Sequence, residues 1–276
     1  MNPIWLVKNV RRVVAVCPTW RDRWQSLSLT YGRKLPGWAR SNSNREISFR
    51  YSPPIGSIKV VIRDNMGADA FIFGEVFDHR YYDFELPVVP QTILDLGANV
   101  GYTAIFFDRK FTNAEIACVE PMPQNVAVLR QNLALNDVAA TVIDAAVTVT
   151  DSIVQMETHA RDYGHKIAVD PMEVTTDLVS CKGISVPSIM KQMGWNRISL
   201  LKVDIEGYER FLLKENCSWL GLVDAICIEC HPGYDEADLK RLAQDYGFQG
   251  PTRLPGTWLL IARKTAELNA VEIARP

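Results

Sequence analysis

The sequence contains no long hydrophobic run. The apolar stretches near its start, residues 4–7 and 13–16, are separated by polar and basic residues. Neither approaches the roughly 20 residues that a membrane-spanning helix needs. They are also too short for the core of a secretory signal peptide, and no small-residue cleavage pattern follows them. We therefore expect a cytoplasmic protein.

Several sequence signatures of other protein classes are also absent. There is no internal repeat, no low-complexity tract, and no match to the phosphate-binding signature G-x-x-x-x-G-K-[ST]. The six cysteines are scattered and mostly lie in apolar segments, as reduced core cysteines do. Cys227 and Cys230 form one C-x-x-C, but inside a strand they would point to opposite faces. These absences argue against a P-loop enzyme, a disulfide framework and a zinc centre.

Positive charge is concentrated at the start of the chain. Residues 1–50 hold ten Lys and Arg against only Asp22 and Glu46, whereas the whole chain has a formal net charge of -2. This segment either contacts an acidic partner or a membrane surface, or it is a solvated helix face whose apolar side packs on the main domain. We expect a basic extension, or cap, over residues 1–69 and a main domain over residues 70–276.

The extension is predicted to contain helices and a hairpin. Residues 4–30 have a helical pattern that Pro18 interrupts or restarts. A short strand is expected at 47–51. Two further strands, 58–63 and 70–73, would be joined by the turn Asp64-Asn65-Met66-Gly67.

From Thr92 onward, short apolar runs alternate with helical patterns. This alternation predicts an α/β fold with a mostly parallel sheet and helices on both faces. A terminal hairpin places one strand antiparallel to its neighbour. The strands are expected at 93–96, 115–119, 140–143, 198–203, 225–229, 248–253 and 258–262, with hairpin strands at 153–157 and 183–186. The helices are expected at 102–109, 124–135, 187–194, 207–214 and 235–246.

The segment Thr92–Gly101 combines a strand, a tight turn and a helix start. Glycines at 97 and 101 let the backbone approach a ligand, and the free N–H groups of a helix start favour negative charge. A dinucleotide fingerprint would require glycine in place of Asn99 and a small residue in place of Tyr102. A nucleoside with a zwitterionic amino-acid tail fits better, because Asp95 can meet its ammonium and the turn its carboxylate.

Two more carboxylates end the following strands. Glu120 closes the second strand and can accept hydrogen bonds from both hydroxyls of a ribose. Asp144, followed by Ala145, ends the third strand within reach of an adenine amino group. Open α/β sheets bind ligands at the carboxyl ends of their strands, so Asp144 and Ala145 are candidate cofactor-binding residues together with Glu120.

Acidic residues and a histidine gather at two later strand ends. Asp204, Glu206 and Glu209 follow one apolar run, and Glu229 and His231 end the next. Imidazole titrates near neutral pH, so His231 is a natural candidate to take a proton from a hydroxyl, with Asp204 as the alternative base. A structural hydrogen-bond pair between the histidine and a carboxylate is the competing interpretation.

A polar and aromatic segment, residues 75–84, leads into the first strand of the main domain. It contains Tyr81 and Tyr82 and would line the mouth of the ligand site. The alternative is a surface helix whose tyrosines pack inward.

Four motifs together resemble a known family. D-L-G-A-N-V-G (95–101), V-E-P (119–121), L-L-K-V-D-I-E-G-Y-E (200–209) and E-C-H-P (229–232) resemble the FkbM-type S-adenosylmethionine-dependent methyltransferases. The match covers about residues 70–262 in order and spacing. The first motif alone is found in many class I methyltransferases, whereas its combination with K-x-D-x-E-G-x-E is much more specific.

The resemblance implies a seven-stranded class I methyltransferase fold. It also implies S-adenosylmethionine as cofactor and O-methylation of a sugar or natural-product hydroxyl. At the matching positions, Asp95, Gly97, Asn99 and Gly101 would surround the methionine part of the cofactor, Glu120 its ribose and Asp144 its adenine, while Asp204, Glu206 and Glu209 would face the methyl-transfer region. The sequence departs from the family at Val186-Pro187-Ser188-Ile189, where T-L-D is common, and this bears on the local helix start.

Alternative functions stay open at this stage. The fold also serves N- and C-methyltransferases, nicotinamide oxidoreductases and non-catalytic interaction modules. No metal is expected, although a divalent ion held by Asp204, Glu206 and Glu229 would be another way to lower the pKa of a hydroxyl. The acceptor is expected to be a small molecule and not a nucleic acid.

Overall fold

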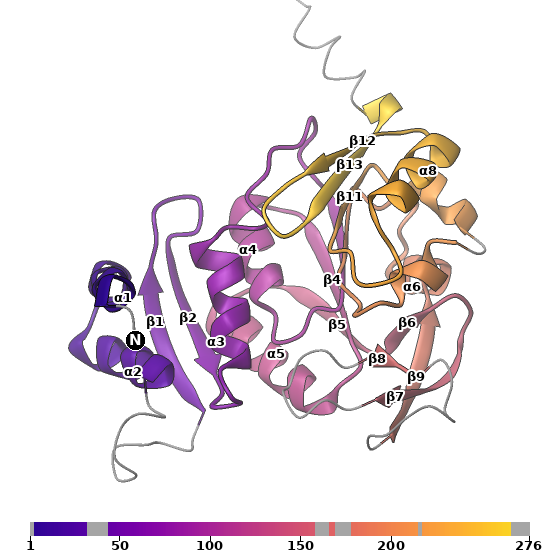
Figure 1. The fold of residues 1–276 in the computed structure, drawn as a ribbon. Helices are drawn as coiled ribbons and strands as arrows, with labels where there is room; N and C mark the ends of the chain where they lie inside the picture. The colour runs from indigo at the N-terminus through magenta and orange to yellow at the C-terminus, as the bar shows by residue number, and fades with distance from the viewer. Residues whose placement is uncertain (1–2, 32–43, 158–165, 169–177, 215–216, 266–276) are drawn as a thin grey trace, which may run out of the picture.

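The computed structural model describes residues 3–31, 44–157, 166–168, 178–214 and 217–265. Within them, the chain forms one large sheet covered by helices, a smaller sheet beside it, and an N-terminal hairpin with two helices (Figure 1). None of the helices in this part of the chain is long and apolar enough to cross a membrane.

The largest sheet has seven strands. Their spatial order is β12 (Phe248–Arg253), β13 (Trp258–Ala262), β11 (Ala225–Ile228), β10 (Leu200–Val203), β3 (Thr92–Leu96), β4 (Glu115–Glu120) and β5 (Ala140–Asp144). The five strands from β11 to β5 are parallel, and β13 is antiparallel to both of its neighbours. This confirms the predicted class I architecture with an antiparallel C-terminal strand.

Both faces of this sheet are buried, which is why its strands are apolar along their length. On one face, Ile93, Ile116 and Leu200 share a core with α4 (Tyr102–Lys110) and α5 (Pro123–Leu135). On the other face, Leu94 and Leu201 belong to a second core. That second core is closed by α6 (Val186–Met193), α7 (Glu209–Leu212), a 3-10 helix (Cys217–Leu222) and α8 (Glu236–Tyr246).

Helix α7 is shorter than the predicted helix over 207–214. Glu206 and Gly207 both have positive φ angles, 54° and 96°, so the chain turns here before the helix can begin. The Glu209 carboxylate then accepts a hydrogen bond from the Ile205 N–H at 3.1 Å. This turn holds Glu206 at the end of β10 and away from the helix.

The N-terminal part contains α1 (Pro3–Val16), α2 (Trp20–Tyr31), and a hairpin of β1 (Arg45–Arg50) and β2 (Ser57–Ile62). The predicted strand over 70–73 is wrong, because this segment lies in helix α3 (Ala68–Phe73), which continues into a π-helix (Gly74–Asp78). The hairpin partner of 58–63 is instead the strand predicted near 47–51.

Asp69 explains why this apolar segment turns back as a helix. The buried Asp69 carboxylate accepts two hydrogen bonds from the Arg63 side chain and one from the Arg63 N–H. The Asn65 side chain bonds both the carboxylate and the N–H of Asp69. A short apolar run gives no periodicity by which helix and strand can be distinguished, so these polar contacts decide the structure.

The smaller sheet has the order β6 (Ala146–Thr148), β9 (Leu178–Ser185), β7 (Ser152–Glu157) and β8 (Lys166–Ile167). Strand β9 is longer than the predicted 183–186, and Val186 opens α6. The sequence departs from the family motif at residues 186–189, but the start of α6 is capped by hydrogen bonds. Ser185 caps the Ser188 N–H, and Asp151 accepts from the Ser185 N–H and the Ser188 hydroxyl.

One hydrophobic core runs across the predicted boundary at residue 69. Phe49 and Val60 of the hairpin pack in the same cluster as Phe73, Phe77 and Tyr102. The division into a cap and a main domain stays a prediction, and the shared core indicates that the hairpin is fixed against the large sheet's helical layer.

Two buried asparagines, Asn132 in α5 and Asn136 directly after it, join the hairpin to this layer. Asn132 accepts from the Val61 N–H at 2.7 Å and donates to the Val100 carbonyl at 2.8 Å. Asn136 makes the same kind of two-sided contact with the N–H and carbonyl of Lys59. The side-chain amides therefore replace the neighbouring strand that the edge of β2 lacks.

Replacing Asn132 by alanine should lower the free energy of unfolding by about 3 kcal/mol, because two buried backbone groups lose their partners. The measurement is urea denaturation followed by circular dichroism. Gln131→Ala, at an exposed position on the same helix, is the matched control and should change stability by less than about 0.5 kcal/mol. Equal stability of the two variants would contradict the role assigned to Asn132.

Candidate active site

A buried ion pair between β3 and β10 fixes the turn that follows β3. Lys202 on β10 and Asp95 on β3 are register partners, so their side chains face the same side of the sheet. The Lys202 Nζ lies 3.0 Å from Asp95 Oδ1 and 2.8 Å from the Gly97 carbonyl, and Thr103 donates to the other Asp95 oxygen. Burial alone would lower the pKa of Lys202, but the charges of Asp95 and Asp204 outweigh it and raise that pKa.

The glycines of this turn are needed for packing. Gly97 and Gly101 have positive φ angles of 81° and 84°. A Cβ at Gly97 would collide with the Asp204 carbonyl oxygen, and one at Gly101 would collide with the Leu129 side chain. The turn can therefore lie directly against the end of β10 only with glycine at 97, whereas glycine at 101 adopts the positive φ without strain and leaves room for the Leu129 side chain.

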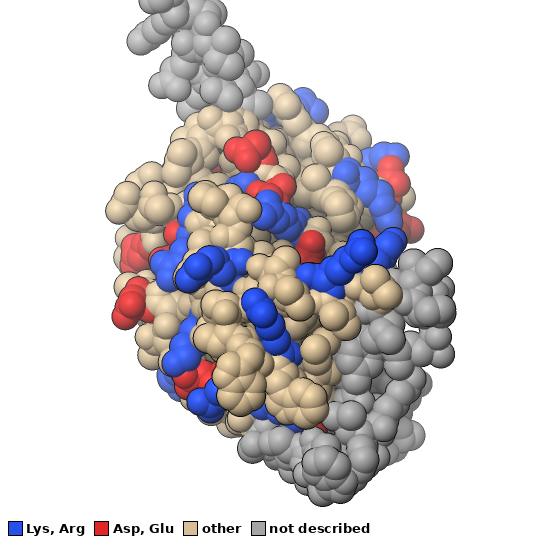
Figure 2. All heavy atoms as spheres, turned by 90° about the vertical axis from the view of Figure 1, so that its left-hand side faces the viewer, with Lys and Arg blue, Asp and Glu red and all other residues tan. Residues whose placement is uncertain are grey.

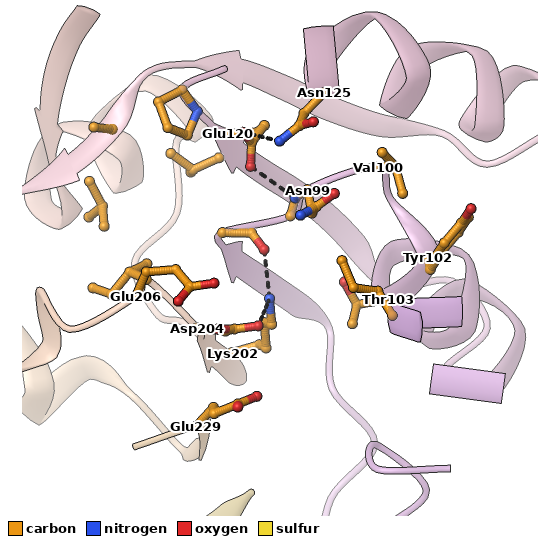
Figure 3. Close-up of a pocket in the computed structure, with 18 of the residues that line it drawn as sticks. Asn99, Val100, Tyr102, Thr103, Glu120, Asn125, Lys202, Asp204, Glu206 and Glu229 are labelled. Carbon is orange, nitrogen blue, oxygen red and sulfur yellow. Dashed lines mark hydrogen bonds and ion pairs between the residues drawn. The ribbon is translucent and has the colours of Figure 1, made fainter. Parts of the chain in front are cut away.

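Glu120 lies at the end of β4 beside this turn (Figure 3). One of its oxygens accepts from the Asn99 N–H at 3.0 Å, and the other accepts from the Met122 N–H at 3.0 Å and the Asn125 amide at 3.1 Å. Burial raises the pKa of Glu120, and these three hydrogen bonds oppose the shift. The carboxylate is held rigidly in the wall of a cavity.

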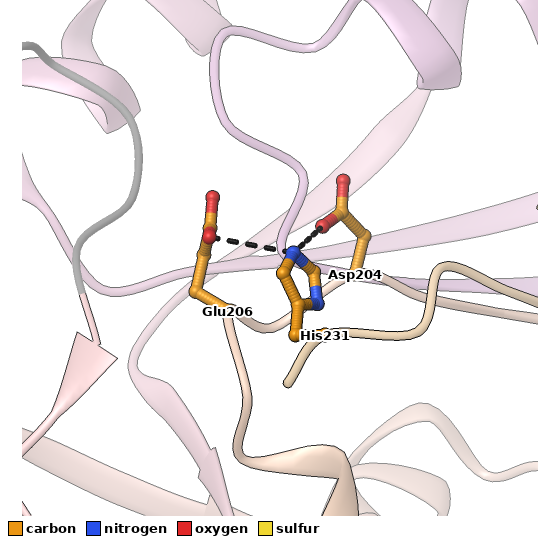
Figure 4. A group of neighbouring side chains, drawn as sticks. All are labelled: Asp204, Glu206 and His231. Atoms are coloured by element: carbon orange, nitrogen blue, oxygen red, sulfur yellow. Dashed lines mark ion pairs between the residues drawn. The ribbon is translucent and has the colours of Figure 1, made fainter. Parts of the chain in front are cut away.

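His231, predicted as a base, stands among three carboxylates. Its Nδ1 lies 3.0 Å from the buried Glu209, and its Nε2 lies 3.4 Å from Glu206 and 3.9 Å from Asp204 (Figure 4). Burial alone would lower the pKa of His231. The hydrogen bond and charge of Glu209, together with the charges of Asp204 and Glu206, outweigh burial and raise that pKa to about 9.

Two further carboxyl groups face the same space and hold their protons more tightly than usual. Burial, followed by the charge of Asp204, raises the pKa of Glu229 to about 8 and that of Glu75 to about 7. Groups with such shifts, gathered in one cavity, mark a candidate functional site.

These side chains surround a cavity of about 370 Å³ at the carboxyl edge of the sheet, within the size range of small-molecule sites. The turn after β3 forms one wall, and the ends of β4, β10 and β11 form others. Apolar side chains complete the lining, among them Phe71, Ile72, Val147, Met156 and Ile167.

Most of the predicted site residues meet in this cavity. The cavity wall contains Gly97, Asn99, Glu120, Ala145, Asp204, Glu206, Glu229, His231 and Tyr82. Asp95 lies beneath the turn, and Gly101 lies behind it against α5.

Three predicted residues lie elsewhere. Asp144 is about half exposed and pairs with Arg130 at 2.8 Å. Glu209 is fully buried behind His231. Tyr81 packs its ring against Gly256, in the turn between β12 and β13.

Sequence reasoning assigned no role to Lys202. It included Glu75 only as part of the segment 75–84 that was expected to line the mouth of the site, and Glu75 and Tyr82 of that segment do line the cavity. The signal for Lys202 was available, since a lysine inside the apolar run of β10 must find a carboxylate if it is buried. Glu75 lies on the π-helix, an element that a sequence pattern does not reveal.

One group in the described part of the chain has the composition of a metal site. One ligand atom from each of Asp204, Glu206 and His231 lies within 4.8 Å of the other two. The predicted third carboxylate, Glu229, lies in the same cavity but is not a member of this group.

The sequence is similar to those of two fungal methyltransferases. The chain is 28% identical over 211 residues to methyltransferase sdnD of Sordaria araneosa, covering 64% of this chain and 81% of the relative. It is 27% identical over 208 residues to methyltransferase 1 of Beauveria bassiana (strain ARSEF 2860), covering 64% and 80%.

A solved structure of methyltransferase FkbM from Methylobacillus flagellatus KT is also similar, with a TM-score of 0.45 and 16% identity. The match covers 68% of this chain and 47% of that protein, so this chain spans about half the length of that relative.

The family comparison covers most of the cavity wall and most of the large sheet. Residues 95–249 match the model of the methyltransferase FkbM domain, which is more than half of the chain and includes the turn, Glu120, Asp204 and His231. On this match, the protein belongs to the FkbM methyltransferase family.

Proposed function

We propose that the protein transfers a methyl group from S-adenosylmethionine to a hydroxyl of a small molecule, a sugar or a natural product. The observation that carries the proposal is the acidic cavity wall, which holds five carboxyl groups: Glu75, Glu120, Asp204, Glu206 and Glu229. Proton uptake at Glu229 and the imidazolium of His231 offset part of this charge, and the other carboxylates leave the wall negative. The lysine in the described wall, Lys202, is already paired with Asp95. Excess negative charge favours a cationic ligand, and S-adenosylmethionine carries a sulfonium and an ammonium.

Individual groups in the wall suit the parts of this cofactor. The Asn99 Oδ1 is buried without a hydrogen-bond partner among the described residues, so it can accept from the ammonium. Glu120 is placed to bind the ribose hydroxyls. Ala145 and Val147 offer an apolar surface to the adenine ring. The same wall would repel the pyrophosphate of a nicotinamide dinucleotide.

The protein's own side chains would position the acceptor and remove its proton. When bound, S-adenosylmethionine supplies an electrophilic methyl group. His231 Nε2 lies between Asp204 and Glu206 and would take the hydroxyl proton. Glu209 fixes the ring through Nδ1. Asp204 and Glu206 stabilise the imidazolium that forms.

The rest of the cavity supports an acceptor that is partly apolar. Phe71, Ile72, Met156 and Ile167 contribute carbon surface to the same cavity wall. A molecule with both hydroxyls and hydrocarbon surface satisfies both parts of such a wall. This favours a hydroxylated natural product or sugar conjugate as acceptor.

Calorimetry should show binding of S-adenosylmethionine and S-adenosylhomocysteine and none of NAD. Glu120→Gln should weaken S-adenosylmethionine binding by about tenfold or more, because the ribose loses a charged acceptor. Asp144→Asn removes an exposed carboxylate paired with Arg130 and should change the affinity by less than about threefold. Binding of NAD without binding of S-adenosylmethionine would overturn the proposal.

His231→Ala should lower turnover by about 100-fold or more while leaving cofactor affinity within a few-fold. His79→Ala, an exposed histidine outside the described cavity wall, is the control. Turnover is measured as S-adenosylhomocysteine released with an acceptor, which mass spectrometry identifies among metabolites methylated in an extract of the source organism.

Unchanged turnover of the His231 variant would remove that residue from the role of base. Activity that disappears with a chelator and returns with Mg²⁺ would instead assign Asp204, Glu206 and His231 to a metal.

The titration of His231 should respond to the charge of the cofactor. With a pKa of about 9, the cofactor-free ring is protonated at pH 7 and loses its proton only as the pH rises through that value. A cationic sulfonium nearby disfavours the imidazolium, so S-adenosylmethionine should lower this pKa more than the neutral sulfur of S-adenosylhomocysteine does. The measurement is NMR of the imidazole protons, assigned with His231→Gln; equal effects of the two ligands would contradict it.

A further inference from the structure

Helix α1 has apolar side chains on two sides, and only one of these sides packs in the hydrophobic core. Val13 and Cys17, which follows the helix, are buried in the core that includes Ile47 and Phe49 of the hairpin. On another side of the same helix, Val7, Val10 and Val14 are 51%, 37% and 48% exposed. Their spacing of three and four residues places them on one stripe, which the described part of the chain leaves exposed.

Helix α2 adds two exposed tryptophans. Trp20 is 80% exposed and Trp24 is 55% exposed, and their spacing of four residues places them on one side of the helix. The two helices pack against each other. Large apolar side chains exposed on two packed helices mark a candidate site of interaction.

The charge around these side chains is positive. Lys8, Arg11 and Arg21 are exposed beside them, whereas Arg12 pairs with Asp78 and Arg23 donates to the Cys17 carbonyl. In Figure 2, which shows the side of the molecule that carries α1 and α2, Lys and Arg side chains cross the middle of the face among uncharged ones.

The N-terminal part of the sequence has almost no acidic residues to balance these basic ones. Asp22 is the only carboxylate in residues 1–45 of the sequence. It is buried and accepts from the Ser48 N–H and the Thr19 hydroxyl. The exposed charges that α1 and α2 contribute are therefore all positive.

We infer that this surface, defined by Val7, Val10, Val14, Trp20, Trp24, Lys8, Arg11 and Arg21, docks the protein on an anionic lipid bilayer. Tryptophan indoles sit at the level of lipid headgroups, where their apolar rings and N–H groups are both satisfied. Valines enter the hydrocarbon boundary, and the basic side chains contact anionic headgroups. None of the eight residues lines the described cavity, so docking leaves the cofactor site free.

A second copy of the chain fits this surface less well. A two-fold symmetric contact would bring the same basic patch of both copies into one interface, and like charges in a contact are repulsive. A bilayer containing anionic lipid complements both the charge and the apolar side chains.

Sedimentation with lipid vesicles tests the inference on the full chain. The protein should bind vesicles of phosphatidylcholine mixed with phosphatidylglycerol more tightly than vesicles of phosphatidylcholine alone, and added salt should weaken the binding. Trp20→Ser/Trp24→Ser should lower the partition coefficient by about tenfold or more. Arg11→Glu/Arg21→Glu should remove the preference for anionic lipid.

The matched control is Ile153→Ser/Lys182→Glu. These two residues are exposed register partners on β7 and β9, in the smaller sheet at the other end of the molecule (Figure 1). The control variant should bind vesicles as the wild type does. All variants should keep the wild-type circular dichroism spectrum and urea denaturation midpoint, which shows that they are folded.

Three results would overturn the inference. In the first, the wild-type protein does not bind the mixed vesicles at low salt. In the second, the tryptophan and arginine variants bind as well as the control does. In the third, light scattering detects a dimer that Trp20→Ser/Trp24→Ser dissociates, which would assign the surface to a second copy of the chain.

Discussion

The candidate site depends on one buried ion pair, Lys202 with Asp95, at the carboxyl ends of the two central strands. A lysine with 2% of its side chain exposed is tolerated only where its charge is matched and its donors are used. Lys202 meets both conditions, because Asp95 supplies the opposite charge and the Gly97 carbonyl accepts a further hydrogen bond. The pair thereby links β3 and β10 to the turn that forms one wall of the cavity.

The position of this turn determines which side chains at the ends of the neighbouring strands face the cavity. With glycine at 97, the backbone of the turn lies against Asp204, and the Asn99 N–H reaches Glu120. Carboxylates from β4 and β10 therefore face the same space. Their mutual repulsion is reduced by proton uptake at Glu229 and by the imidazolium of His231. A cationic ligand would relieve the same repulsion, which connects the fold to the proposed chemistry.

The N-terminal segment is linked to this site through packing and a few polar contacts. Arg12 of α1 pairs with Asp78, at the end of the π-helix whose Glu75 lines the cavity. Asn132 fixes β2 to α5. The helices that expose tryptophans and basic residues are thus joined to one wall of the cavity through direct contacts.

The sequence by itself determined which residues lie at the ligand-binding edge. Alternating strands and helices impose a parallel sheet, and a parallel sheet brings the ends of its strands, with Glu120, Asp204 and His231, to one edge. Only the tertiary structure decided where each side chain points and what it touches. It turned Asp144 toward Arg130, placed Glu209 behind the histidine, and made a helix of residues 68–73. These orientations depend on contacts between segments far apart in the chain, and the local pattern of apolar and polar residues does not predict such contacts.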